Sequence, residues 1–77
     1  MSVYEEFRRS VARVTRTAEQ DITPETLLKN IKADSFHWVQ IFIALESALD
    51  IELNVDQEVM KQLVTVDDFV KYIEKSM

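Results

Sequence analysis

The chain has 77 residues, which is room for one domain spanning residues 1–77. Hydrophobic residues make up 47% of it, so it can form a core and is not compositionally disordered. It contains no cysteine and no glycine. This composition excludes disulfides, thiolate chemistry and glycine-rich phosphate-binding loops.

The net charge of −5 is unevenly distributed. Residues 1–17 carry four arginines against two glutamates, a balance of +2, whereas the remainder carries five lysines against twelve acids, a balance of −7. An acidic surface repels nucleic-acid phosphates, so we expect no nucleic-acid partner and instead steering toward basic proteins. No apolar run of about 18 residues and no signal-peptide pattern is present, which predicts a cytoplasmic protein without a transmembrane segment.

The first predicted element is a helix over about residues 2–17, because apolar residues recur there at steps of three and four. Residues 19–34 show no long periodic pattern, although Thr23-Pro24-Glu25 could open a short helical turn, since proline is tolerated at a first helical position. A connection of this length is unusual in so small a domain, and long connections are often functional. It leads directly to Ser35.

A second helix is predicted from about Ser35 to Leu49, and it carries two apolar stripes where a core needs only one. The first stripe consists of Trp38, Phe42, Leu45 and Leu49. The second consists of Phe36, Val39 and Ile43. The surplus stripe indicates either a fully buried central helix or an exposed landing surface for other proteins.

The last third of the chain predicts a crossing segment and two more helices. Asp56 can cap a short third helix and Thr65 a longer last one. The fold class is therefore all-α, an antiparallel four-helix bundle with three longer helices and one short helix. Its expected core consists of Phe7, Val11, Ile41, Phe42, Leu45, Leu49, Phe69 and Ile73. Left-handed backbone positions are expected at Asn30, Asp50 and Asn54, because Asn and Asp tolerate that conformation best after glycine.

The sequence predicts no catalytic residues and no metal site. His37, the only histidine, is two positions from Ser35 on a predicted helix, where side chains do not face each other. No Ser–His relay is therefore expected, and His37 is expected to face solvent. Ser35 has two open interpretations: its hydroxyl caps the helix, or it is held at the surface for modification.

Several segments, taken in order, resemble the acyl carrier protein family. Ala33-Asp34-Ser35-Phe36 is similar to the Asp-Ser-Leu attachment motif, with phenylalanine in place of leucine. The other matching segments are Thr23-Pro24-Glu25, Ala44-Leu45-Glu46, Asp50-Ile51-Glu52-Leu53 and Leu63-Val64-Thr65-Val66. The resemblance implies a 4′-phosphopantetheine arm on Ser35, whose thiol holds an acyl group as a thioester.

The resemblance also implies a monomeric, non-enzymatic carrier in fatty-acid, lipid or polyketide-type biosynthesis. Its expected partners are a phosphopantetheinyl transferase and the enzymes that load and process the acyl group. The residues expected to contact them are Asp34, Phe36, Val39, Ile43 and Glu46. Two alternatives stay open: an aminoacyl or peptidyl carrier of a specialised pathway, and an unmodified helical protein–protein adaptor.

Four residues depart from the family pattern. Lys32 replaces a common glycine, His37 and Gln40 replace acids, and Trp38 is bulkier than the usual residue. These departures weaken an assignment to housekeeping fatty-acid synthesis. The spacing of Trp38 with Phe42 predicts that its ring points toward the core, where it would limit the space for a long acyl chain.

Overall fold

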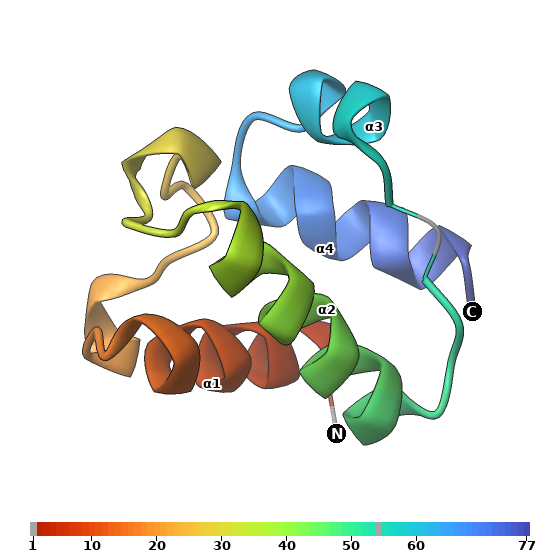
Figure 1. Cartoon of the computed structure of the whole chain (residues 1–77), viewed down its shortest axis with the longest axis horizontal. Helices are drawn as coiled ribbons and strands as arrows, with labels where there is room; N and C mark the ends of the chain where they lie inside the picture. Colours follow the sequence, from red (N-terminus) through yellow and green to blue (C-terminus); the bar gives the residue numbers. More distant parts are fainter. Residues whose placement is uncertain (1, 54) are drawn as a thin grey trace.

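The computed structural model describes residues 2–53 and 55–77. These contain four α-helices, α1 (Val3–Thr15), α2 (Ser35–Leu49), α3 (Gln57–Gln62) and α4 (Val66–Lys75). Two short 3₁₀ turns, η1 (Glu19–Asp21) and η2 (Leu28–Asn30), lie in the connection between α1 and α2. Helix α1 packs against α2 and α4, and α4 runs opposite to α1 (Figure 1). The predicted all-α bundle of three longer helices and one short helix is confirmed.

Helix α1 is shorter than predicted. It begins after Ser2, whose hydroxyl accepts a hydrogen bond from the Glu5 backbone N–H at 3.0 Å. It ends at Thr15 because Arg16 takes a left-handed conformation, with φ at 58°. In that conformation Cβ crowds the following carbonyl oxygen, which disfavours a residue other than glycine. In a chain without glycine, an arginine therefore stops the first helix.

One hydrophobic core joins α1, α2 and α4. Its fully buried side chains include Phe7, Val11, Ile41, Leu45, Val66, Phe69 and Ile73. The prediction that Phe42 and Leu49 belong to this buried set is only partly correct. Both side chains pack against the core, but they remain half-buried. Phe42 faces an open groove on one side, and Leu49 is the last residue of α2.

The long connection between α1 and α2 is tied to the start of α4 by backbone hydrogen bonds. Leu28 donates to the Val64 carbonyl, Val66 to that of Thr26 and Asp67 to that of Pro24, each at 2.9 Å. Tyr4 Oη also donates to the Ile22 carbonyl at 3.0 Å. These bonds fix the segment that leads into α2. The possible helical turn at Thr23-Pro24-Glu25 is limited to one turn, closed by a hydrogen bond from the Thr26 N–H to the Thr23 carbonyl, and no helix continues from it.

The predicted left-handed positions are only partly correct. Asp50 adopts this conformation at the end of α2, with φ at 53°. Asn30 does not, because it is the last residue of η2, and Asn54 lies outside the described residues.

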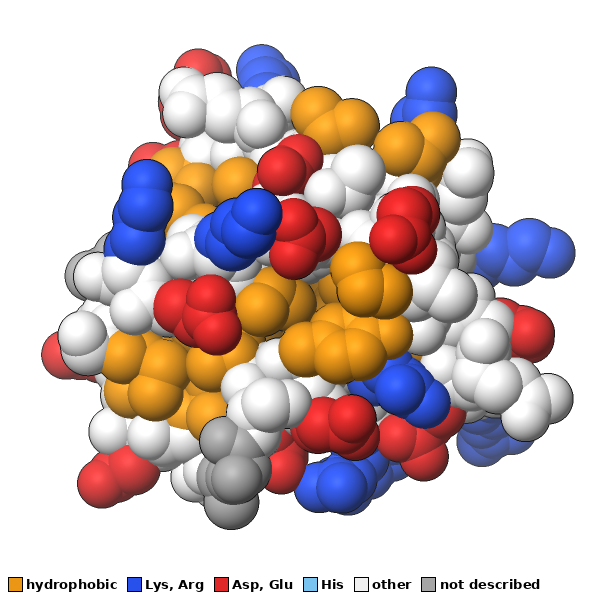
Figure 2. Space-filling view, turned by 180° about the vertical axis from the view of Figure 1, so that it is seen from behind, with side chains coloured by type: hydrophobic (Ala, Val, Ile, Leu, Met, Phe, Trp, Pro, Cys, Tyr) orange, Lys and Arg blue, Asp and Glu red, His pale blue; other side chains and the backbone are white. Residues whose placement is uncertain are grey.

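Within the described ranges, no helix is both long and apolar enough to cross a membrane. Viewed from behind, the molecule carries acidic and basic side chains intermixed around small apolar patches (Figure 2).

Candidate functional site

Asp34 fixes the point at which α2 begins. Its carboxylate Oδ1 accepts the backbone N–H of His37 at 2.9 Å, and the His37 Nδ1 accepts the backbone N–H of Asp34 at 3.3 Å. This reciprocal pair is a capping box, which satisfies two backbone donors at once. The backbone N–H bond from His37 holds the pKa of the Asp34 carboxyl below its ordinary value of 3.8.

Ser35 is the first residue of α2 and its side chain is exposed. Because Asp34 occupies the capping position, the interpretation of Ser35 as the helix cap is wrong. Its hydroxyl is therefore presented at the surface, next to the backbone N–H groups of the first helical turn. A helix N-terminus favours negative charge, so a phosphate ester at this position would be stabilised by the helix dipole.

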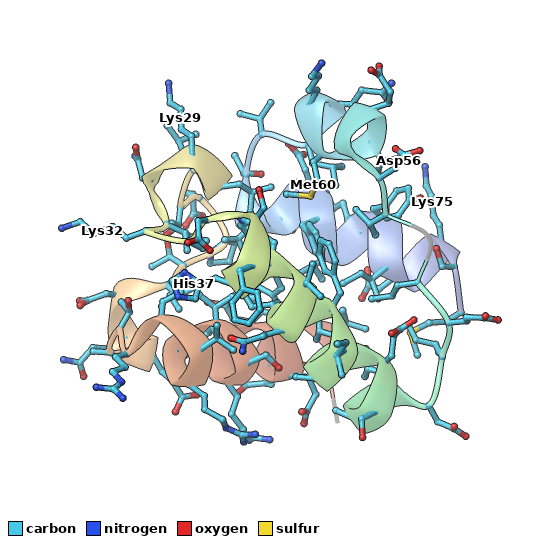
Figure 3. The ribbon with its side chains drawn as sticks, in the orientation of Figure 1. Lys29, Lys32, His37, Asp56, Met60 and Lys75 are labelled. Atoms are coloured by element: carbon cyan, nitrogen blue, oxygen red, sulfur yellow. The ribbon has the colours of Figure 1, made fainter. Side chains whose placement is uncertain are left out.

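An apolar groove of about 670 Å³ opens beside Ser35 between α2 and α3. Its lining residues are Ala33, Asp34, Ser35, Trp38, Val39, Phe42, Val55, Asp56 and Met60. Met60 extends from α3 toward the body of the molecule, whereas Lys29 and Lys32 point away from it (Figure 3). The site thus combines an exposed hydroxyl with an adjacent apolar surface.

Trp38 lies between this groove and the core. Its ring centroid is 6.3 Å from that of Phe7, 5.9 Å from that of Phe42 and 6.0 Å from that of Phe69. These separations fall in the range of direct aromatic contact, about 4.5–7 Å. The predicted inward orientation of Trp38 is confirmed, although the residue stays half-buried because its outer edge lines the groove.

The surplus stripe of α2 is exposed. Phe36, Val39 and Ile43 have 68%, 52% and 58% of their surface accessible. Their exposure rules out the interpretation of α2 as a helix buried on all sides. Asp34 is also exposed, but Glu46 is half-buried and its Oε2 accepts the Leu53 backbone N–H at 2.8 Å. Glu46 therefore holds the segment that follows α2, a structural role absent from the sequence-based interpretation.

The sequence patterns missed the capping role of His37 and the contribution of α3 to the groove. His37 is not simply solvent-facing, because its imidazole completes the capping box. Glu or Gln usually fills that position, so histidine gave no signal. Val55 and Met60 reach the site through tertiary packing, which no local spacing encodes. Among the described residues, no cluster of three or more acidic or histidine side chains is placed to hold a metal ion.

Comparison with known proteins assigns the chain to a family. The family described as the phosphopantetheine attachment site matches residues 5–73. The acyl carrier protein of Helicobacter pylori is 33% identical to the chain, covering 96% of it and 94% of that protein. The acyl carrier protein of Desulforapulum autotrophicum is 30% identical, with 97% of both proteins covered.

The chain belongs to the acyl carrier protein family, whose members carry 4′-phosphopantetheine. It is a carrier and not an enzyme. The residues present fit this prosthetic group, because an exposed serine hydroxyl stands at a helix N-terminus beside an apolar groove. The hydroxyl can form a phosphate ester, and the apolar groove lies beside it.

Proposed function

We propose that Ser35 is the attachment residue and that the chain presents an acyl group, held as a thioester on the arm, to enzymes of fatty-acid, lipid or polyketide-type biosynthesis. The observation that supports this most directly is the exposed Ser35 hydroxyl at the first position of α2. The arm supplies the thiol that this cysteine-free chain lacks.

The attachment step is a phosphoryl transfer from coenzyme A. The Ser35 oxygen attacks the phosphorus that bears the pantetheine group, while the anhydride bond to the adenosine bisphosphate half breaks and that half leaves. The serine proton passes to a base on the separate, magnesium-dependent transferase. The product is a phosphodiester between Ser35 and the arm, and no oxidation or reduction takes place.

Intact-mass measurement after co-expression with a phosphopantetheinyl transferase tests the attachment. We expect the wild-type chain to gain the mass of one arm and Ser35→Ala to gain none. Ser47→Ala is the matched control, because Ser47 is an exposed serine on the same helix. An unmodified wild-type chain, or a Ser35→Ala chain that is still modified, would contradict the proposal.

The proposed contact surface for the transferase and the acyl-loading and acyl-processing enzymes consists of Asp34, Phe36, Val39, Ile43 and Glu46. The exposure of its three apolar members supports this assignment, because such stripes on a small protein mark interaction sites. Glu46 contributes through one carboxylate oxygen while the other binds the Leu53 N–H.

We further propose that residues 1–77 act as a single monomeric domain in the cytoplasm, which light scattering and cell fractionation can test.

A further inference from the structure

The core next to Ser35 is filled by aromatic rings. Phe7, Trp38, Phe42 and Phe69 form a continuous cluster with ring centroids 4.9–6.3 Å apart. Phe7 and Phe69 have no accessible surface at all. An acyl chain that entered the bundle here would have to displace one of these rings. Protein cores pack as densely as organic crystals, so such a displacement would be strongly unfavourable.

Trp38 also lines two neighbouring pockets. On one side lies the groove beside Ser35, of about 670 Å³. On the other side lies a second cavity of about 450 Å³, bounded by apolar residues of η2 and of the segment after α3, with Lys29 and Lys61 among its lining residues. Three residues, Ala33, Trp38 and Met60, line both cavities. The indole is the largest of these three side chains, so it is the largest obstacle between the two pockets.

We infer that Trp38 determines the length of the cargo. It confines the thioester-linked group to the open groove and selects short apolar acyl groups over long ones. This inference rests on the proposed attachment at Ser35, because a group on that arm reaches the surfaces close to it. Short groups bury their apolar atoms against Trp38, Phe42 and Met60, whereas atoms that reach beyond the indole stay in water.

The first test loads the protein with a series of groups and measures its thermal stability. A phosphopantetheinyl transferase transfers the arm from acetyl-, butanoyl-, hexanoyl-, octanoyl- or decanoyl-coenzyme A, and intact mass confirms each product. For wild type, we expect the melting temperature, relative to the form with a bare arm, to stop rising between hexanoyl and decanoyl. In Trp38→Ala the two cavities join, so the rise should continue by up to about 3–6 °C for each methylene group that becomes fully buried.

Two further variants serve as a control and as a substitute for Trp38→Ala. Ile73→Ala removes a buried side chain that lines neither cavity, and it should show the wild-type plateau. If Ile73→Ala also gains stability with long chains, general rescue of a weakened core explains the result and the inference is wrong. Should Trp38→Ala fail to fold, Trp38→Leu keeps an apolar side chain and should give a smaller continued rise.

The second test uses the wild-type chain alone. Trp38 is its only tryptophan, so its fluorescence reports directly on the groove. Loading a butanoyl group should cover the outer edge of the indole and reduce quenching by acrylamide, and a decanoyl group should add no further protection. Unchanged quenching on loading would overturn the inference, as would a wild-type melting temperature that keeps rising to decanoyl. A chain that gains no arm mass contradicts the proposed attachment at Ser35 instead. The intact mass therefore distinguishes failure of the proposed function from failure of the inference about Trp38.

Discussion

The Nδ1 atom of His37 lies 3.3 Å from the backbone nitrogen of Asp34 and 3.3 Å from its carboxylate Oδ1. The imidazole nitrogen accepts the backbone N–H of Asp34. In return, the His37 backbone N–H donates to Asp34 Oδ1 at 2.9 Å. The cap immediately before Ser35 is therefore built from two reciprocal bonds between the same two residues.

The charge on Asp34 makes stability depend on acid pH. Its pKa is lowered below 3.8, chiefly by the His37 backbone N–H, so the folded chain binds this proton more weakly than the unfolded chain. The stabilisation is therefore complete above about pH 5 and is lost as the pH falls through the lowered pKa. Melting temperatures should be higher for wild type than for Asp34→Asn near neutral pH and should converge in acid. Asp21 is an exposed acid in η1, so Asp21→Asn should differ less from wild type in melting temperature near neutral pH. If the difference between wild type and Asp34→Asn stayed the same at all pH values, the prediction would be wrong.

The aromatic core should dominate stability. Phe69→Ala removes a ring with no accessible surface and should lower the free energy of unfolding by about 3–5 kcal/mol. Phe36→Ala makes the same chemical change at a position that is 68% exposed, and it should change this free energy by no more than about 0.5 kcal/mol. Urea denaturation followed by circular dichroism measures both values. Equal effects of the two substitutions would show that the core has been misidentified.

The apolar stripe of α2 should contribute to the rate of arm loading. Val39→Ala should lower kcat/KM of the transferase roughly 5-fold, because two fewer carbon atoms are buried in the transient complex, about 1 kcal/mol. Val64→Ala is the matched control, since Val64 is 56% exposed but lies before α4 rather than on α2. Both variants should melt close to wild type. An equal loss in the two variants would rule out a localised docking surface.

The sequence was informative about elements whose signals are local. Apolar spacing located α2, and Asp56 and Thr65 were correctly predicted as the caps of α3 and α4. What it missed depends on contacts between distant segments. The end of α1 depends on Arg16 adopting a left-handed conformation, which no propensity favours. One side of the groove beside Ser35 is formed by Val55 and Met60, which are distant in sequence from Trp38.

Salt dependence tests the departures from the family pattern. Exposed charges attract a basic partner over distances that salt screens, about 10 Å at 0.1 M ionic strength. Because Gln40 is an exposed neutral residue on α2, Gln40→Glu should raise the loading rate at low salt and steepen its fall as salt increases. Gln20→Glu adds the same charge in η1 and should have less effect. If Gln20→Glu steepened the salt dependence of the loading rate more than Gln40→Glu does, the transferase would bind a face other than that of α2.

Backbone hydrogen bonds join the long connection to the start of α4, two parts of the chain that are distant in sequence. Leu28 and Val66 each donate across this junction, so both amides should exchange with deuterium at similar rates. Unfolding of the start of α4 would free the segment that leads to Asp34, and the presentation of Ser35 would be lost in the same event. The start of α4, distant from Ser35 in sequence, thus helps to hold the segment that presents the Ser35 hydroxyl.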